Sequence, residues 1–428
     1  MSVNIVCSLS VIMLVKSGKE FFKMNYSETL EFIHSLGNFS RPAGLERIKC
    51  LLGKLGSPEK ELCAVHVAGT NGKGSVSVML AKIFETAGFK TGLFISPYII
   101  DFRERIQING EFISETELVR YADIVRAAGV EVTEFEFITA AAFSYFRDMK
   151  CDIVIAETGL GGRLDATNTL ENVRAAVITK IGLDHTAVLG DTIEKIAYEK
   201  SGIIKSFPAV SSPFQPEAAL SVIKNHAKTL CIPDLSKLET VKSDEYGNTF
   251  IYKECEYRTS LIGEYQVENA VTAIEAVKAS GFDIPYETVR RALSEIYFPA
   301  RMEIISKEPF ILLDGAHNPQ GAKMLTDFAR CVGKRFALVV SVSADKDLYG
   351  ICSALAEAAS CVYVCAFRGV RAAAPQTVAE AFEKVGIRAN VFSSFSEAME
   401  GAIKSGEPIM ICGSLYLAGE ALAMFRRG

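Results

Sequence analysis

The sequence predicts an α/β protein in which a mostly parallel sheet is flanked by helices and a second, smaller α/β domain follows. From Glu61 onward, short apolar segments alternate with amphipathic helical patterns, and this alternation is typical of parallel sheets covered by helices. A second alternating series starts after residues 297–303, and a chain of 428 residues is too long for one ordinary core. We therefore expect one domain at residues 24–296 and another at residues 297–428.

The elements of the first domain are predicted from the spacing of apolar residues. Met24 begins a helical pattern, "MNYSETLEFIHSL", and the first strand follows further along the chain. The predicted strands are 62–68, 90–96, 151–157 and 174–182, and the predicted helices are 73–87, 115–129, 134–149, 192–204, 266–279 and 288–295.

Residues 238–259 interrupt this order because polar and apolar residues alternate there around the turn signal "EYGN". This pattern favours an antiparallel hairpin at the edge of the sheet. Pro299 breaks regular structure in the connection to the second domain. The strands predicted in that domain are 309–316, 334–342, 360–367, 388–394 and 408–414.

Composition excludes several classes of protein. Hydrophobic residues make up 49% of the chain and charged residues 23%, which is ordinary for a soluble globular protein. A net charge of −5 disfavours a general nucleic-acid binder. Eleven cysteines without a C-x-x-C pair favour a reducing cytoplasm over a disulfide framework or a zinc site. We expect a cytoplasmic protein that binds neither nucleic acid nor membranes.

The N-terminus contains an apolar run, Val3 to Val15, that is too short to span a bilayer. No positive residue precedes it and no clear cleavage site follows it, so it is a poor signal peptide. We expect residues 1–23 to be an upstream extension or the product of a misassigned start, with a weak anchor or signal as the alternative.

The segment "VHVAGTNGKGSVSVML" (residues 65–80) has the parts of a phosphate-binding loop, although it departs from the strict pattern G-x-x-x-x-G-K-[ST]. Val67 stands where the first glycine should be, and Gly74 separates Lys73 from Ser75. Three glycines between a strand and a helix can still turn backbone N–H groups toward phosphates at the positive end of the helix. Lys73 can reach the terminal phosphates and Ser75 can offer a hydroxyl to Mg²⁺. A glycine-rich turn without a ligand is the alternative.

The sequence "HVAGTNGKGS" resembles the phosphate-binding loop of the folylpolyglutamate synthase and dihydrofolate synthase family, which is part of the Mur ligase superfamily. The resemblance extends in order from about Met24 to the C-terminus. It rests on "SPYIIDFRERIQING", "TEFEFITAAAF", "ETGLGGRLDATN", "ITKIGLDHTAVLGDTIEKIAYEKSGIIK", "LDGAHNP", "ADKD" and "CGSLYLAGE".

The resemblance implies an ATP site and Mg²⁺ ions, two of them by our expectation. Lys73, His185 and Lys200 are the expected catalytic residues. The expected metal ligands are Ser75, Glu136, His185 and a carbamylated Lys200. The expected ATP-binding residues are Gly69, Thr70, Asn71, Gly72, Lys73, Gly74, Ser75, Asn269, Arg301, Asp314 and His317. The structural alternatives are a helix-surface acid for Glu136, a structural histidine for His185 and a solvated ion pair for Lys200.

The loop "GLGGRLDATN" resembles one that the family uses near the folate, which makes Arg163 and Asp165 the expected folate-binding residues; a surface turn is the alternative. The sequence departs from the family at "SPY", where histidine usually replaces Tyr98, and at Tyr265. It also reads "FPAR" where the family usually has "W-x-G-R". These departures concern the positioning of the substrate rather than the ATP chemistry.

The activity implied by the resemblance is ATP-dependent amide formation between L-glutamate and a folate or dihydropteroate, through an acyl phosphate. We expect a monomer with both activities. The alternatives are one activity alone, another Mur-type amino-acid ligase, or a degenerate binding paralogue. A GTPase switch is disfavoured because no N-K-x-D motif lies in a suitable loop.

Overall fold

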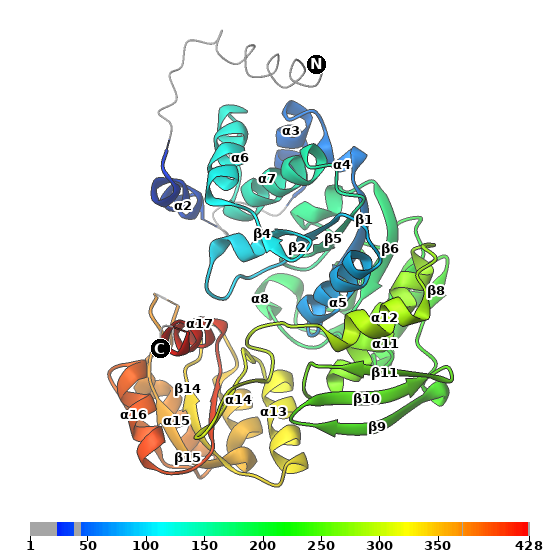
Figure 1. Ribbon diagram of the computed structural model, residues 1–428. Coiled ribbons are helices and arrows are strands. Elements are labelled where there is room, and N and C mark those ends of the chain that lie inside the picture. Colours follow the sequence, from blue (N-terminus) through cyan, green and yellow to red (C-terminus); the bar gives the residue numbers. More distant parts are fainter. Residues whose placement is uncertain (1–23, 38–43, 370, 427–428) are drawn as a thin grey trace.

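The structure is a computed structural model, and it describes residues 24–37, 44–369 and 371–426 (Figure 1). The predictions about residues 1–23 lie outside the described residues. The α/β class is confirmed, with two parallel-rich sheets in separate parts of the chain. In the part of the chain that is described, no helix is long and apolar enough to cross a membrane.

The first sheet has eight strands in the order β4-β3-β2-β5-β1-β6-β7-β8. Strands β1, β2, β5, β6, β7 and β8 are parallel, and β3 and β4 add an antiparallel edge. Its strands are β1 (Cys63–Ala68), β2 (Thr91–Phe94), β3 (Ile106–Ile108), β4 (Glu111–Phe112), β5 (Ile153–Glu157), β6 (Asn172–Ile178), β7 (Ala209–Ser211) and β8 (Leu230–Cys231).

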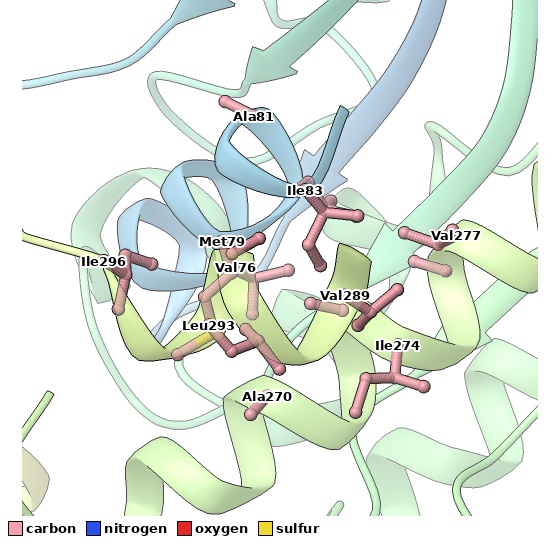
Figure 2. Packing of buried hydrophobic residues seen from close by; sticks show 14 of the residues in the cluster. Val76, Met79, Ala81, Ile83, Ala270, Ile274, Val277, Val289, Leu293 and Ile296 are labelled. Carbon is pink, nitrogen blue, oxygen red and sulfur yellow. The ribbon is translucent and has the colours of Figure 1, made fainter. Parts of the chain in front are cut away.

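Helices cover both faces of this sheet, as an α/β sheet with two apolar faces requires. One face packs against α5 (Lys73–Thr86), α11 (Tyr265–Ala279) and α12 (Tyr286–Ser294), whose apolar side chains interlock in Figure 2. The other face packs against α2 (Tyr26–Ser35), α3 (Glu46–Lys54), α6 (Glu115–Ala127) and α7 (Glu134–Asp148). The remaining helices of this part are α4 (Pro58–Glu61), α8 (Thr186–Leu189), α9 (Ile193–Ser201) and α10 (Glu217–His226).

The segment predicted as an edge hairpin forms a separate antiparallel sheet of three strands instead. Strand β10 (Gly247–Tyr252) pairs with β9 (Leu238–Asp244) on one side and β11 (Cys255–Thr259) on the other. The prediction of an edge position was wrong because the buried side chains of Phe250, Tyr252 and Tyr257 pack on the α5–α11–α12 side instead of extending the main sheet.

The second sheet has six strands in the order β12-β13-β17-β14-β15-β16, of which only β12 is antiparallel. Helices cover both of its faces (Figure 1). Its strands are β12 (Glu303–Lys307), β13 (Phe310–Leu313), β14 (Phe336–Val340), β15 (Ala359–Val364), β16 (Ala389–Val391) and β17 (Ile409–Cys412). Its helices are α13 (Pro319–Cys331), α14 (Leu348–Leu355), α15 (Pro375–Lys384), α16 (Phe395–Lys404) and α17 (Leu415–Phe425).

Candidate functional site

The glycine-rich loop joins the end of β1 to the start of α5, as the sequence predicts. Gly72 precedes the helix at φ 86°, a left-handed conformation that glycine adopts without strain. A side chain at Gly72 would place its Cβ 2.4 Å from Asn269 Oδ1, and one at Gly69 would place it 1.8 Å from Thr179 Oγ1. The loop therefore needs glycine at both positions, and it opens the N-terminus of α5 toward a cleft.

The cleft has a volume of about 450 Å³ and lies between the two sheet-containing parts of the chain. Every residue predicted to bind ATP lines it: Gly69, Thr70, Asn71, Gly72, Lys73, Gly74, Ser75, Asn269, Arg301, Asp314 and His317. His185 and Lys200 line it as well. Residues far apart in the sequence are thus brought to one cavity, at the carboxyl ends of the strands where open parallel sheets bind ligands.

Glu157 is a site residue that the sequence analysis quoted within a motif but gave no role. It ends β5, lines the cleft, and its carboxylate lies 4.0 Å from Lys73 Nζ. Burial raises the pKa of Glu157, while the nearby ammonium of Lys73 opposes this change. The position at a strand end was the only available signal, since parallel strands deliver their last residues to the ligand edge.

Lys200 projects from α9 into the base of the loop. Its ammonium donates a hydrogen bond to the carbonyl oxygen of Gly69 at 2.7 Å, and the side chain is almost completely buried. Burial and, after it, the charge of Lys73 lower the pKa of Lys200 to about 7. The solvated ion pair considered as its alternative is absent, because Glu199 pairs with Arg163 instead.

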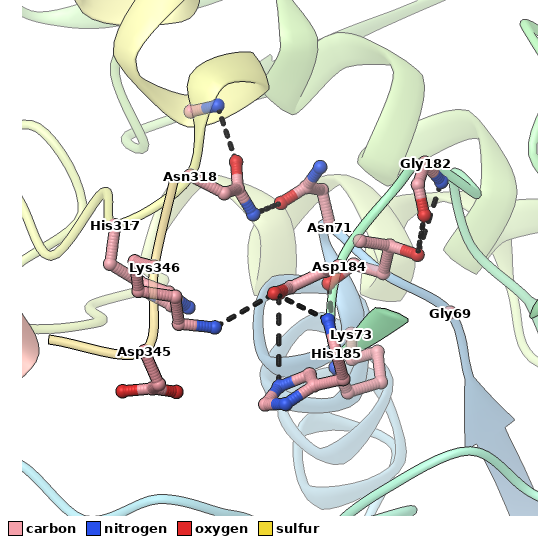
Figure 3. Close-up of polar contacts among 12 residues, drawn as sticks. Gly69, Asn71, Lys73, Gly182, Asp184, His185, His317, Asn318, Asp345 and Lys346 are labelled. Atoms are coloured by element: carbon pink, nitrogen blue, oxygen red, sulfur yellow. Dashed lines mark hydrogen bonds and ion pairs between the residues drawn. The ribbon is translucent and has the colours of Figure 1, made fainter. Parts of the chain in front are cut away.

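Asp184 and His185 follow the end of β6 and face residues from the second sheet (Figure 3). Burial opposes ionisation of Asp184, but His185 and Lys346 outweigh it and lower its pKa to about 2. Burial lowers the pKa of His185 to about 4; the nearby carboxylate of Asp184 opposes this change, and Lys346, Lys73 and Lys200 act in the same direction as burial. His185 is therefore a neutral imidazole at neutral pH, the form that can ligate a metal ion.

The second part of the chain contributes Arg301, Asp314 and His317. Arg301 lies over the ring of Phe298, with 5.1 Å from its guanidinium carbon to the ring centre. Asp314 is buried and accepts backbone hydrogen bonds from Met302 at 2.8 Å and Ala316 at 2.6 Å, so it shapes the connection that carries Arg301. Burial lowers the pKa of His317 to about 4.

Glu136 does not line the cleft, so the geometry gives no support to the expectation that it binds Mg²⁺. Its carboxylate accepts hydrogen bonds from the backbone and hydroxyl of Thr133 at 2.8 and 3.0 Å, closing the N-terminus of α7. Arg47 pairs with its other oxygen at 3.0 Å. The buried carboxylate that needed a partner is therefore satisfied as a helix cap and ion pair.

The predicted folate-binding side chains also have other partners. Arg163 pairs with Glu199 at 2.8 Å, and neither Arg163 nor Asp165 lines the cleft. Asp165 is buried and accepts hydrogen bonds from Leu160 N at 2.9 Å and from the hydroxyl of Thr167. Asp165 thus shapes the loop from within, and residues 159–161 are the part of it that faces the cleft.

Of the positions that depart from the family pattern, Tyr265 lines the cleft and Phe298 contacts one of its glycines. Phe298 packs on Gly74, where a Cβ would lie 2.9 Å from the ring. Tyr265 is among the lining residues, and burial raises its pKa. Tyr98 packs edge-on to Phe102, with ring centres 5.5 Å apart.

The donor groups of the cleft suit Mg²⁺ only in part. Among the described residues, no group of three or more His, Cys, Asp or Glu side chains could by itself hold a metal ion. Mg²⁺ is usually held by one or two protein oxygen ligands together with substrate phosphates, so this finding fits a nucleotide-dependent site. Glu157 and Ser75 supply such oxygens beside the loop.

Two family models match the chain. Residues 67–277 match the Mur ligase middle domain, and residues 300–415 match the Mur ligase glutamate ligase domain. The chain is 35% identical to the folylpolyglutamate synthase of Lacticaseibacillus casei, with 92% of this chain and 97% of that protein covered. It is 37% identical to the dihydrofolate synthase/folylpolyglutamate synthase of Bacillus subtilis, with 92% and 98% covered.

Solved structures agree with these sequence matches. The Mycobacterium tuberculosis folylpolyglutamate synthase complexed with ADP and AMPPCP is 30% identical and has a TM-score of 0.85, with 94% of this chain and 100% of that chain covered. Escherichia coli FolC in complex with DHPP and ADP is 28% identical and has a TM-score of 0.84, with 95% and 99% covered.

Proposed function

The chain belongs to the folylpolyglutamate synthase and dihydrofolate synthase family of Mur ligases, and we propose that its cleft joins L-glutamate to folates through an acyl phosphate made from ATP. It is an ATP-dependent ligase that adds glutamate to folates. The main support for the proposal is the phosphate-binding loop formed by the end of β1, the glycine-rich segment and the start of α5. In this loop Lys73 lies beside Glu157, and Arg301 lines the same cleft.

The first step of the proposed reaction is attack of the substrate carboxylate on the γ-phosphate, which releases ADP. Lys73 would bind and orient the terminal phosphates from the N-terminus of α5, where the helix dipole also favours an anion. Arg301 would approach the same phosphates from the other side with its fork of donors. Bound between these cations, the phosphoryl group would carry less unfavourable charge during transfer.

Glu157 and Ser75 would hold a Mg²⁺ ion on the nucleotide, with His185 as a further ligand. When bound, the ion would neutralise charge on the transferring phosphoryl group. Glu157 takes the role that the sequence analysis gave to Glu136, because only Glu157 reaches the cleft.

Lys200 is proposed to become a second metal ligand by carbamylation. Its neutral amine would add to the carbon of CO₂ and lose one proton, which gives a carbamate anion. A pKa of about 7 leaves about half of the amines neutral at pH 7, against about one in three thousand for an ordinary lysine. The buried position beside Gly69 thus favours a modification that an exposed lysine would rarely undergo.

In the second step, the amine of glutamate attacks the carbonyl of the acyl phosphate and releases phosphate. Water would compete in this reaction, so the cleft must close around the intermediate. At the start of α13, Asn318 donates a hydrogen bond to Asn71 of the glycine loop at 3.0 Å and Gln320 accepts one from it at 2.6 Å, while His317 lines the same cleft. We propose that they help the second domain to exclude water.

We also propose that the chain has both activities, acts as a monomer in the cytoplasm and binds no nucleic acid. The Bacillus subtilis and Escherichia coli relatives are named for both synthase activities, which supports the first of these points. Steady-state release of ADP should be measured with dihydropteroate and with tetrahydrofolate as acceptors, with and without glutamate. Activity with only one acceptor would reject the bifunctional proposal. Absence of glutamate-dependent ADP release with either acceptor would reject the ligase proposal.

A further inference from the structure

Lys346 belongs to the segment "ADKD", which the sequence analysis singled out and the proposed function does not use. The segment lies between β14 and α14, in the second sheet-containing part of the chain. The ammonium of Lys346 reaches Asp184, in the first part, with Nζ 2.7 Å from Oδ1 (Figure 3). The lysine side chain is 8% exposed and the aspartate side chain 12%. This is a largely buried ion pair between two domains.

Asp184 has a second partner within its own segment. Its Oδ1 also accepts a hydrogen bond from the backbone N–H of His185 at 2.9 Å, and its Oδ2 lies 3.8 Å from His185 Nε2. His185 has a φ of 51°, a left-handed conformation that is strained for a residue with a side chain. The carboxylate of Asp184 therefore helps to hold the unusual backbone that presents His185 to the cleft.

A buried ion pair is weak evidence for stability, since the cost of removing two charges from water offsets much of their attraction. The ion pair is more informative about how the two domains are positioned. If the ammonium and the carboxylate did not contact each other, each would be left as an unpaired charge in a largely buried place. The pair can form only when residues 344–347 lie against residues 182–185. Docking of the second domain and the backbone conformation at His185 are thus linked through one carboxylate.

We propose that Lys346 is a positioning residue for the ligase reaction, which fixes Asp184 and thereby the conformation of residues 182–185 when the second domain is docked. The inference rests on the proposed function of the cleft. It predicts that Lys346 acts on the catalytic step more than on the binding of ATP, because the pair holds Asp184 beside His185, whereas Thr70 of the glycine loop is bonded to Gly182 without any contribution from Lys346.

The test compares Lys346→Met with Lys195→Met. Lys195 also pairs with an aspartate, Asp191, at 2.8 Å, but both residues of this pair are exposed and lie within one domain. For Lys346→Met we expect kcat for glutamate-dependent ADP release to fall on the order of 10- to 100-fold, because small misplacements of catalytic groups are costly. The KM for ATP should change less than about 3-fold. Lys195→Met should match the wild type, and Lys346→Arg should recover part of the lost kcat.

The double variant K346M/D184N removes both charges and so leaves no buried charge unpaired. If the two residues act through each other, it should lose no more activity than the worse single variant. Losses that multiply, or a Lys346→Met enzyme with wild-type kcat, would overturn the proposal. The double variant leaves no unpaired charge, so its activity can still be compared with that of the wild type if Lys346→Met folds poorly.

Hydrogen–deuterium exchange of the nucleotide-free protein supplies a readout that does not depend on activity. Residues 181–190 should exchange faster in Lys346→Met than in the wild type and Lys195→Met, while the core strands stay protected. Unchanged exchange in this segment would reject the positioning role. If the wild type shows no glutamate-dependent ADP release, the proposed function fails, and the exchange comparison still decides whether Lys346 orders the segment.

Discussion

Replacing Lys200 by methionine should make the protein more stable while abolishing its activity. The ammonium of Lys200 is buried, and its hydrogen bond to the carbonyl oxygen of Gly69 offsets only part of its loss of water. Methionine has a similar length and no charge, so it can fill the same space without the desolvation cost. Natural active sites commonly keep such destabilising groups because the reaction needs them.

The size of the effect follows from the pKa of Lys200, which burial lowers from 10.5 to about 7. A change of this size corresponds to an upper limit of about 5 kcal/mol for the charged form. Methionine also leaves the carbonyl of Gly69 without its donor, which costs about 1 kcal/mol or more. We therefore expect Lys200→Met to raise the free energy of unfolding by roughly 2–4 kcal/mol at about pH 6.5.

The sign of the pH dependence is fixed by which state binds more protons. Between about pH 7 and 10.5 the unfolded chain keeps the proton on Lys200 that the folded chain has released. Wild-type stability should therefore rise with pH in this window, by up to about 1.4 kcal/mol per pH unit from this group. Below pH 7 both states are protonated, so the full penalty applies there.

The assay is denaturant unfolding followed by circular dichroism at about pH 6.5 and about pH 9.5, in buffer free of bicarbonate. The stability advantage of Lys200→Met over the wild type should shrink at the higher pH. Lys195→Met is the control, since Lys195 is fully exposed, and it should show no such advantage. An equal difference between Lys200→Met and the wild type at both pH values would refute the reasoning, because it would mean that Lys200 has an ordinary pKa in the folded protein.

The remaining predictions concern single groups of the cleft. Lys73→Ala should reduce glutamate-dependent ADP release at least about 100-fold without a change in the unfolding midpoint. Lys82→Ala, on the same helix, is the control and should leave ADP release intact. Equal losses of ADP release in the two variants would show that the effect is not local. Glu157→Gln should abolish ligation. Glu136→Gln should keep kcat within about 2-fold and lower the free energy of unfolding by about 1–2 kcal/mol in denaturant unfolding. If Glu136→Gln abolished ligation and Glu157→Gln did not, Glu136 would be the metal ligand. Gly72→Ala should weaken ADP binding about 10-fold or more by calorimetry, because its Cβ would strike Asn269 in a left-handed turn, and unchanged affinity would refute the cradle geometry.

The fold and the phosphate loop could be predicted from the sequence because both depend on local patterns. The predicted strand at residues 62–68 and helix at residues 73–87 match β1 and α5 to within a residue. The glycines between them were recognised as a turn, and the structure shows why Gly69 and Gly72 accept no side chain. Antiparallel β12 was missed, since residues 303–307 are half-buried and lack a continuous apolar run.

The partners of charged side chains could not be predicted in the same way. Glu136 and Glu157 are both acids within apolar segments, and the apolar residues around them do not distinguish the two. The difference lies in the third dimension, since α7 turns Glu136 toward Arg47 while β5 ends with Glu157 at the ligand edge. The position of each residue in its predicted element favours Glu157. The last residue of a parallel strand reaches the edge of the sheet where ligands bind. An acid in the first turn of a helix commonly caps that helix instead.

Three lysines converge on His185, and their origins explain how a chain of net charge −5 can bind a nucleotide. Lys73 comes from the glycine loop, Lys200 from α9 and Lys346 from the second domain, and each lowers the pKa of His185. The side chains of Lys200 and Lys346 are almost completely buried, so their charges are screened less than charges on the surface. Lys346 is already paired with Asp184, so a bound polyphosphate would mainly interact with Lys73 and Lys200. The proposed carbamylation of Lys200 would further reduce the positive charge, because it would replace one of these cations with an anion.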